Sequence, residues 1–172
     1  SKIVSKLVAA MFVLVVASPA FAAETIKIGS IQPLTDWGAA EGNFNRDGAR
    51  IAMDKINAEG GINGKMLEIF FEDGRNDPAD SLNAAQKLIN RDKVSAMFGC
   101  WLSSATLAVV PTAERVGVPF IVEVSGAEEI THPAKNYVYR LSTLFSQEAE
   151  GARKAVKELG VKKVTFIAQD ND

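Results

Sequence analysis

Short apolar runs alternate along the chain with longer segments whose apolar residues recur every three or four positions. The short runs are rich in Ile, Val and Phe and predict β-strands. The predicted strands are 26–31, 66–72, 94–99, 118–124, 137–141 and 164–168. The longer segments predict amphipathic helices within 44–56, 77–89, 103–116 and 145–159. Strands that alternate with helices indicate parallel pairing, so we expect a doubly wound α/β fold with helices on both faces of the sheet.

Turn and capping residues mark the ends of the predicted helices. Asp77 has the position of an N-cap, and Pro78 follows it at the first helical position. Gly60 and Gly160 end the helical patterns that precede them. Pro111 lies inside the third helical segment, where the loss of one backbone donor predicts a kink or a restart.

The N-terminal segment has a different character from the rest of the chain. Lys2 and Lys6 precede the unbroken apolar run 7–17, and Ala20-Phe21-Ala22 has the small-x-small form of a cleavage site. The run is too short to span a bilayer, which takes about 20 apolar residues. We therefore expect residues 1–22 to be a cleaved signal peptide, and the mature protein to be soluble in the periplasm.

The composition excludes several classes of function. The chain has 172 residues with a net charge of −2, which leaves no basic field for nucleic acid. One His and one Cys cannot form a closed zinc site, so no metal is expected, and Cys100 is predicted to pack in the interior.

Enzyme motifs are also lacking. The glycines after the first predicted strand do not have the G-x-G-x-x-G spacing, and no P-loop sequence occurs, so no nucleotide cofactor is expected. Ser103 lacks the glycine flanks of a nucleophile elbow. His132 precedes Pro133 and has the sequence context of a surface turn. The sequence therefore favours binding over catalysis.

Ligands of open α/β sheets bind outside the carboxyl ends of the strands. Three segments of this chain meet that condition: 32–42, 100–106 and 123–131. Ser103 begins a predicted helix, where a Ser can cap the helix and free N–H groups attract carboxylate or phosphate oxygens. Trp37, Trp101 and the Ser125-Gly126 turn fall in the same segments. Together they predict a pocket for a small organic anion or zwitterion, although Ser103 could be a plain cap and either Trp could lie in the core.

Several stretches then point to one family. They are IKIGSIQPLT, NAEGGING, EDGRNDP, GCWLSSAT, GVPFIVEVSGAEEIT and YVYRLSTLFSQEAEGA. In order and spacing they closely resemble the periplasmic solute-binding proteins of the branched-chain amino-acid type, which serve ATP-driven importers.

This resemblance implies a two-lobed clamshell with the ligand between two doubly wound lobes. Residues 23–142 would form the contiguous part of the first lobe, with a hinge crossing at 139–143. Residues 143–172 would hold the hinge crossing and the beginning of a second lobe. Members of the family are about twice as long as this chain, so the resemblance implies an N-terminal fragment.

The resemblance also assigns roles within the predicted pocket. Ser103 and backbone groups at Val124 and Gly126, on either side of Ser125, would hold a carboxylate and an ammonium. Trp37, Trp101 and Leu102 would face the ligand side chain. Gly126 stands where the family commonly has Thr, which removes one polar contact to an amino acid, and Trp101 is bulkier than the usual aliphatic residue. Asn76 and Leu102 stand where some members have a disulfide.

Three functions are weighed on this basis. The first is an extracytoplasmic receptor that captures an amino acid, a small amide or a small carboxylate and delivers it to the membrane permease of an ABC importer. The second is a ligand-sensing domain of the same fold that feeds a signalling partner. The third, an exported enzyme, is disfavoured because no usable catalytic group is found.

Overall fold

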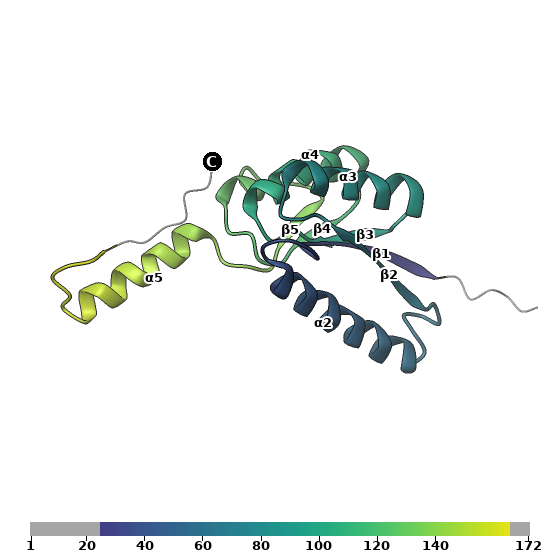
Figure 1. The fold of residues 1–172 in the computed structure, drawn as a ribbon, viewed down its shortest axis with the longest axis horizontal. Coiled ribbons are helices and arrows are strands. Elements are labelled where there is room, and N and C mark those ends of the chain that lie inside the picture. Colours follow the sequence, from purple (N-terminus) through teal and green to yellow (C-terminus); the bar gives the residue numbers. More distant parts are fainter. Residues whose placement is uncertain (1–24, 166–172) are drawn as a thin grey trace, which may run out of the picture.

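The computed structural model describes residues 25–165, and within that range it contains one parallel sheet in the order β2-β1-β3-β4-β5 (Figure 1). The strands are β1 (Ile26–Gln32), β2 (Leu67–Asp73), β3 (Ala96–Gly99), β4 (Phe120–Val122) and β5 (Val138–Arg140). The helices are α2 (Ala39–Ala58), α3 (Pro78–Lys87), α4 (Ser103–Val116) and α5 (Phe145–Glu158), with a π-helical turn η1 (Leu88–Asp92) and a 3-10 turn η2 (Glu128–Ile130).

The sheet has helices on both faces. Figure 1 shows α2 on one side of the strands and α3 and α4 together on the other. Strand β1 is an internal strand, since Ile28 pairs with Ile69 of β2 on one side and with Ala96 of β3 on the other. These features confirm the predicted doubly wound α/β class.

The hydrophobic core lies between the sheet and the α3–α4 layer. Phe120 of β4 is the largest fully buried side chain, and Leu88 and Val109 are also fully buried. The α3–α4 layer therefore supplies most of the apolar burial that stabilises the sheet.

The start of α3 and the course of α4 can be compared with the sequence predictions. The Asp77 carboxylate accepts hydrogen bonds from the amides of Ala79 (2.8 Å) and Asp80 (2.9 Å), which confirms the predicted N-cap. Helix α4 runs through Pro111 without a restart and ends at Gly117, whose φ of 78° needs a residue without a Cβ.

The strand ends were less well predicted. The fourth predicted strand shortens to β4, and the fifth shortens to β5. Residues 164–165 are irregular, and 166–168 of the predicted last strand lie outside the described residues. The predicted signal peptide also lies outside them. Among residues 25–165, no helix is both long enough and apolar enough to cross a membrane.

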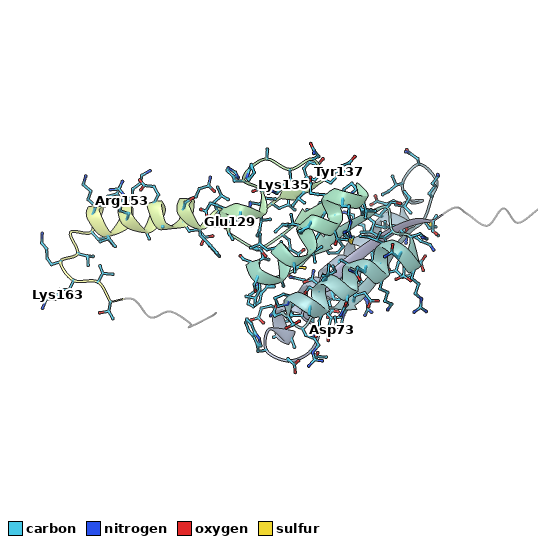
Figure 2. The ribbon with its side chains drawn as sticks, turned by 90° about the horizontal axis from the view of Figure 1, so that it is seen from above. Asp73, Glu129, Lys135, Tyr137, Arg153 and Lys163 are labelled. Atoms are coloured by element: carbon cyan, nitrogen blue, oxygen red, sulfur yellow. The ribbon has the colours of Figure 1, made fainter. Side chains whose placement is uncertain are left out.

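Two predicted apolar stripes are not buried. Phe44 on α2 is 74% exposed and Ile51 is 70% exposed, and of the residues of this helix only Gly42 is buried. Helix α5 has no buried residue and projects away from the sheet in both views (Figures 1 and 2), with Arg153 and Lys163 on this projecting part.

Candidate functional site

The chain reverses its direction across the sheet between β1 and β3. From β1 it crosses through α2 to β2, whereas from β3 it crosses through α4 to β4 on the opposite side. The carboxyl ends of β1 and β3 therefore flank a topological switch point, the usual ligand position in this fold class.

A pocket of about 270 Å³ opens at this point. Its lining comes from the loops after β1, β3 and β4 and from the first residues of α4 and α5. The lining residues are Trp37, Trp101, Leu102, Ser103, Val124, Ser125, Gly126 and Phe145. The structure thus brings together all seven residues predicted from the sequence and adds Phe145. The sequence pattern placed Phe145 only in an amphipathic helical stripe.

Three aromatic rings line the pocket. Trp37 and Trp101 lie with their ring centroids 6.3 Å apart at an interplanar angle of 50°. Phe145 lies against Gly126, where a Cβ built on the glycine would come within 2.4 Å of the Phe145 ring. Neither Trp belongs to the buried core, so both rings are available to a ligand.

Ser103 does not cap α4. Leu102 occupies the N-cap position and makes no side-chain cap, and Ser103 is the first helical residue. Its hydroxyl instead accepts a hydrogen bond from the Ala127 amide (3.3 Å). A plain cap at Ser103 is wrong because the helix begins at Ser103 itself, one residue earlier than a capping Ser103 requires. Ser103 consequently links the N-terminus of α4 to the loop after β4.

The first turn of α4 offers backbone donors beside Ser103. The first i→i−4 bond of this helix runs from the Thr106 amide to the Leu102 carbonyl (2.9 Å). The amides of residues 103–105 precede that bond and so have no acceptor within the helix. Together with the helix dipole they can hold a carboxylate.

The side chain of Ser125 joins the loops behind the pocket. Its hydroxyl is buried and lies 2.6 Å from the Thr106 hydroxyl, 3.0 Å from the Trp101 carbonyl and 3.2 Å from the Cys100 carbonyl. These contacts hold the loop after β4 against the start of α4. The Ser125 hydroxyl is thus a structural group.

Arg140 of β5 holds the same loop in place, a role that no sequence pattern indicated. Its guanidinium donates to the carbonyls of Ser125 and Ala127, the latter at 2.5 Å, and its Nε donates to the Thr131 hydroxyl (3.3 Å). The Ser142 hydroxyl also donates to the Ser125 carbonyl (3.1 Å). Bidentate guanidinium contacts of this kind restrict both position and orientation.

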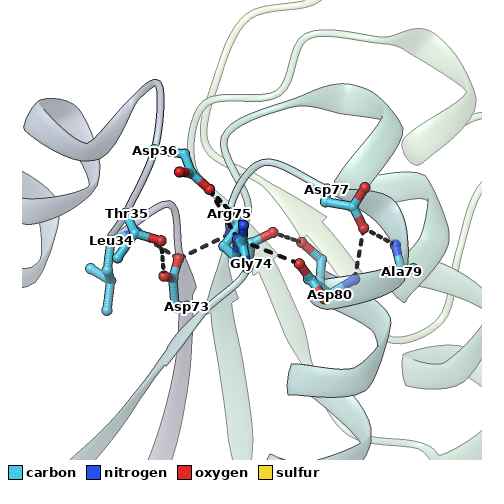
Figure 3. Close-up of polar contacts among 10 residues, drawn as sticks. Leu34, Thr35, Asp36, Asp73, Gly74, Arg75, Asp77, Ala79 and Asp80 are labelled. Carbon is cyan, nitrogen blue, oxygen red and sulfur yellow. Dashed lines mark hydrogen bonds and ion pairs between the residues drawn. The ribbon is translucent and has the colours of Figure 1, made fainter.

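A second polar network holds the loop that carries Trp37 (Figure 3). Arg75 donates from Nε to Asp36 (3.0 Å), and Asp73 accepts from the Leu34 amide (2.8 Å) and the Thr35 hydroxyl (2.5 Å). Burial alone would raise the pKa of Asp73, but the hydrogen bonds from Thr35, Leu34 and Arg75 outweigh it and lower that pKa. This network ties the loop after β1 to the loop after β2.

Asn76 supports the backbone of Trp37. It stands where some relatives were expected to have a disulfide, it is buried, and its Nδ2 donates to the Trp37 carbonyl (3.3 Å). The adjoining Gly38 has a φ of 85°, and a Cβ there would lie 2.5 Å from the Asn76 amide nitrogen. Asn76 and Gly38 therefore set the backbone conformation from which the Trp37 ring extends.

Glu123, a half-buried carboxylate, lies at the start of the loop after β4. Glu123 accepts hydrogen bonds from Gln32 Nε2 (2.6 Å) and Asn45 Nδ2 (3.2 Å), and burial raises its pKa above the ordinary value. It does not line the pocket. Its amide partners come from β1 and α2, so it connects those elements to the end of β4.

The remaining candidates have no part in the pocket. Cys100 is buried, and burial raises its pKa to about 12, which confirms its predicted packing role. His132 lies in an exposed turn, as predicted. Across residues 25–165, no three His, Cys, Asp or Glu side chains are grouped so that they could hold a metal ion.

Comparison with known proteins identifies the family. Residues 25–172 match the periplasmic binding protein family. The leucine-, isoleucine-, valine-, threonine- and alanine-binding protein of Pseudomonas aeruginosa is 34% identical over 166 residues, which cover 96% of this chain and 44% of that protein.

Solved structures agree with this match. The substrate-binding protein of a branched-chain amino-acid transporter from Streptococcus pneumoniae, in complex with isoleucine, has a TM-score of 0.67 at 34% identity and covers 70% of this chain and 34% of its own. A solute-binding protein of an ABC transporter from Rhodopseudomonas palustris, in complex with 3,4-dihydroxybenzoic acid, has a TM-score of 0.73 at 29% identity over 80% of this chain and 37% of its own. The chain thus spans less than half the length of these relatives, and it belongs to the periplasmic binding protein family, among relatives of the branched-chain amino-acid-binding type.

Proposed function

We propose that the protein is the substrate-binding component of an ABC importer and that it captures a small carboxylate-bearing solute outside the cytoplasmic membrane. Family membership supports the extracytoplasmic location and the transport role. The observation that carries the ligand class is the position of Ser103 in the pocket lining, at the N-terminus of α4 where the first amides have no acceptor within the helix. An anion bound there gains hydrogen bonds and the favourable end of the helix dipole.

The ligands of the relatives fit this class. Isoleucine and 3,4-dihydroxybenzoic acid, bound to the Streptococcus and Rhodopseudomonas proteins, differ in their side chains but share a carboxylate. A carboxylate subsite at α4 with a variable apolar wall would serve either ligand. We place the carboxylate of the solute at Ser103 and its remaining atoms against the aromatic rings.

The domain boundaries form part of the proposal. Residues 23–142 hold β1–β5 and would act as one lobe, and residues 143–172 would cross the hinge and begin a second lobe, after export directed by residues 1–22. Two lobes that close on the solute would present a distinct bound form to the membrane permease. The described residues that line the pocket are apolar side chains, two Ser and a Gly, which suits capture of a solute.

Substitution of Ser103 tests this proposal. In the protein expressed from its complete gene, Ser103→Ala is expected to weaken carboxylate binding by about 1–3 kcal/mol, since it removes a hydrogen bond to a charged group. Isothermal titration calorimetry measures the change. Ser104→Ala is the matched control, because Ser104 is exposed, adjacent and outside the pocket. Equal affinities of the two variants would show that the solute does not bind at Ser103.

A further inference from the structure

The apolar side chains of the pocket are unusually open to solvent. Trp37 is 49% exposed, Phe145 is 54% exposed and Val124 is 41% exposed, and all three line the same pocket as Trp101 and Leu102. Contiguous exposed apolar surface with a few polar groups at one end is typical of a ligand groove. Three of these five side chains carry flat aromatic rings.

Phe145 and Gly126 depend on each other. The Phe145 amide donates to the Gly126 carbonyl (3.0 Å), and the ring lies where a side chain on residue 126 would begin. The shortest distances from a Cβ at 126 are 2.4 Å to two ring atoms of Phe145, so any other residue there must displace the ring. A side chain with a hydroxyl at position 126 and the Phe145 ring would therefore occupy the same space. In this chain the ring occupies it.

Three carbonyl groups of the loop after β4 already accept hydrogen bonds. The Ser125 carbonyl accepts from Arg140 and Ser142, the Gly126 carbonyl from the Phe145 amide, and the Ala127 carbonyl from Arg140. In the described part of this loop, the Glu123 and Val124 carbonyls accept no hydrogen bond, whereas those of residues 125–127 each accept at least one. An ammonium group needs several acceptors when it leaves water, and this side of the pocket has few to offer.

These observations distinguish amino acids, which carry an α-ammonium group, from carboxylates that lack one. The pocket presents backbone donors at α4 and flat apolar surface, whereas the carbonyls of residues 125–127 already accept hydrogen bonds and the described lining has no acidic side chain. We infer that the solute is an aryl carboxylate without an α-ammonium group, and that Phe145 together with Gly126 determines this specificity. The inference rests on the proposed function and narrows its ligand class.

Four probes measure separately how the aromatic ring and the ammonium group of a solute affect its affinity. They are 3-phenylpropanoate and L-phenylalanine, which differ only in the ammonium, and 4-methylpentanoate and L-leucine, which differ in the same way with an aliphatic side chain. Calorimetry with the protein from the complete gene is expected to show 3-phenylpropanoate binding at least ten-fold more tightly than each of the other three. Tighter binding of either amino acid than of its deaminated partner would overturn the inference and leave the proposed carboxylate receptor intact. Failure of all four probes to bind would overturn both.

Two variants test the residues. Phe145→Leu is expected to reduce affinity for 3-phenylpropanoate about ten-fold or more and to change affinity for 4-methylpentanoate much less. Phe44→Leu is the matched control, since Phe44 is an exposed Phe on α2 outside the pocket. Gly126→Thr, which displaces the ring and adds a hydroxyl, is expected to shift the preference toward L-phenylalanine. A Phe145→Leu variant that loses no more affinity than Phe44→Leu would show that the ring has no part in selection.

Discussion

The sheet body, which comprises β1–β5 with α2, α3 and α4, and the projecting helix α5 use similar sequence patterns with opposite results. Apolar residues at helical spacing are buried in α3 and α4, where they meet the sheet and form the core. The same spacing in α5 leaves every residue of the helix unburied, and Leu159 just beyond it is 79% exposed. An amphipathic stripe therefore predicts a helix, but burial requires a second surface that only the fold supplies.

The largest expected effect is on the free energy of unfolding, and it should differ between a buried and an exposed phenylalanine. Phe120 is 0% exposed in the sheet body, and Phe120→Ala should lower the free energy of unfolding by about 3–5 kcal/mol because it leaves a cavity. Phe145→Ala should lower it by about 1 kcal/mol at most, since over half of that side chain remains in water. Urea unfolding of both variants measures the difference, and equal losses would contradict the contrast.

Two glycines of α2 are expected to respond in opposite directions. A Cβ at Gly42 would lie 2.0 Å from the Pro33 carbonyl oxygen, so Gly42→Ala should destabilise the protein by about 1–3 kcal/mol. Gly48 has no neighbour within 4 Å of its Cβ position, and Gly48→Ala should stabilise it by about 0.5–1 kcal/mol through helix propensity. Thermal unfolding checks both signs. A stabilising Gly42→Ala would show that α2 does not pack closely against the loop after β1.

The smallest effects concern two carboxylates of the sheet body with opposite pKa shifts. Burial raises the pKa of Glu123, so its contribution to stability falls as pH rises from its ordinary value of 4.5 through its folded pKa. Glu123→Gln keeps the hydrogen-bond acceptor for Gln32 and Asn45, and it should gain stability relative to the natural protein as pH rises from 4 to 8.

Asp73 should show the reverse dependence, because hydrogen bonds overcome burial and lower its pKa below 3.8. Its contribution is present above that ordinary value and is lost as pH falls through the folded pKa. Asp73→Asn should therefore be less stable than the natural protein at pH 7, by an amount that shrinks in acid. Melting temperatures across pH 2–8 test both residues, and parallel curves for the natural protein and both variants would refute the assigned shifts.

Much of the fold and pocket could be predicted because the signals were local or topological. Asp77 and Pro78 specify a helix start within a few residues, and the alternation of strands and helices specifies a parallel sheet. Trp37, Ser103 and Gly126 are far apart in the sequence, yet each follows a strand. Carboxyl ends of parallel strands meet at one edge, which is why all the predicted site residues meet in one pocket.

The remainder depended on contacts that no local pattern encodes. Phe145 was assigned to a helical stripe because its spacing fits one, but its ring packs on Gly126 of a distant loop. Arg140 holds the Ser125 and Ala127 carbonyls across the turn η2, and nothing in the sequence around it indicates that geometry. Ser103 is not a cap because the helix begins at Ser103 itself, one residue earlier than a cap at this position would require.

A crystal structure of the protein from the complete gene, with the most tightly bound of the four carboxylate probes, tests the central claim most directly. The account predicts carboxylate oxygens within about 3 Å of the Ser103 hydroxyl and of the first-turn amides of α4, with the remaining atoms against Trp37 and Trp101. The opposite result would be a carboxylate bound elsewhere, for example beside Arg75 and Lys87 in the cavity of about 240 Å³ between β2 and α3.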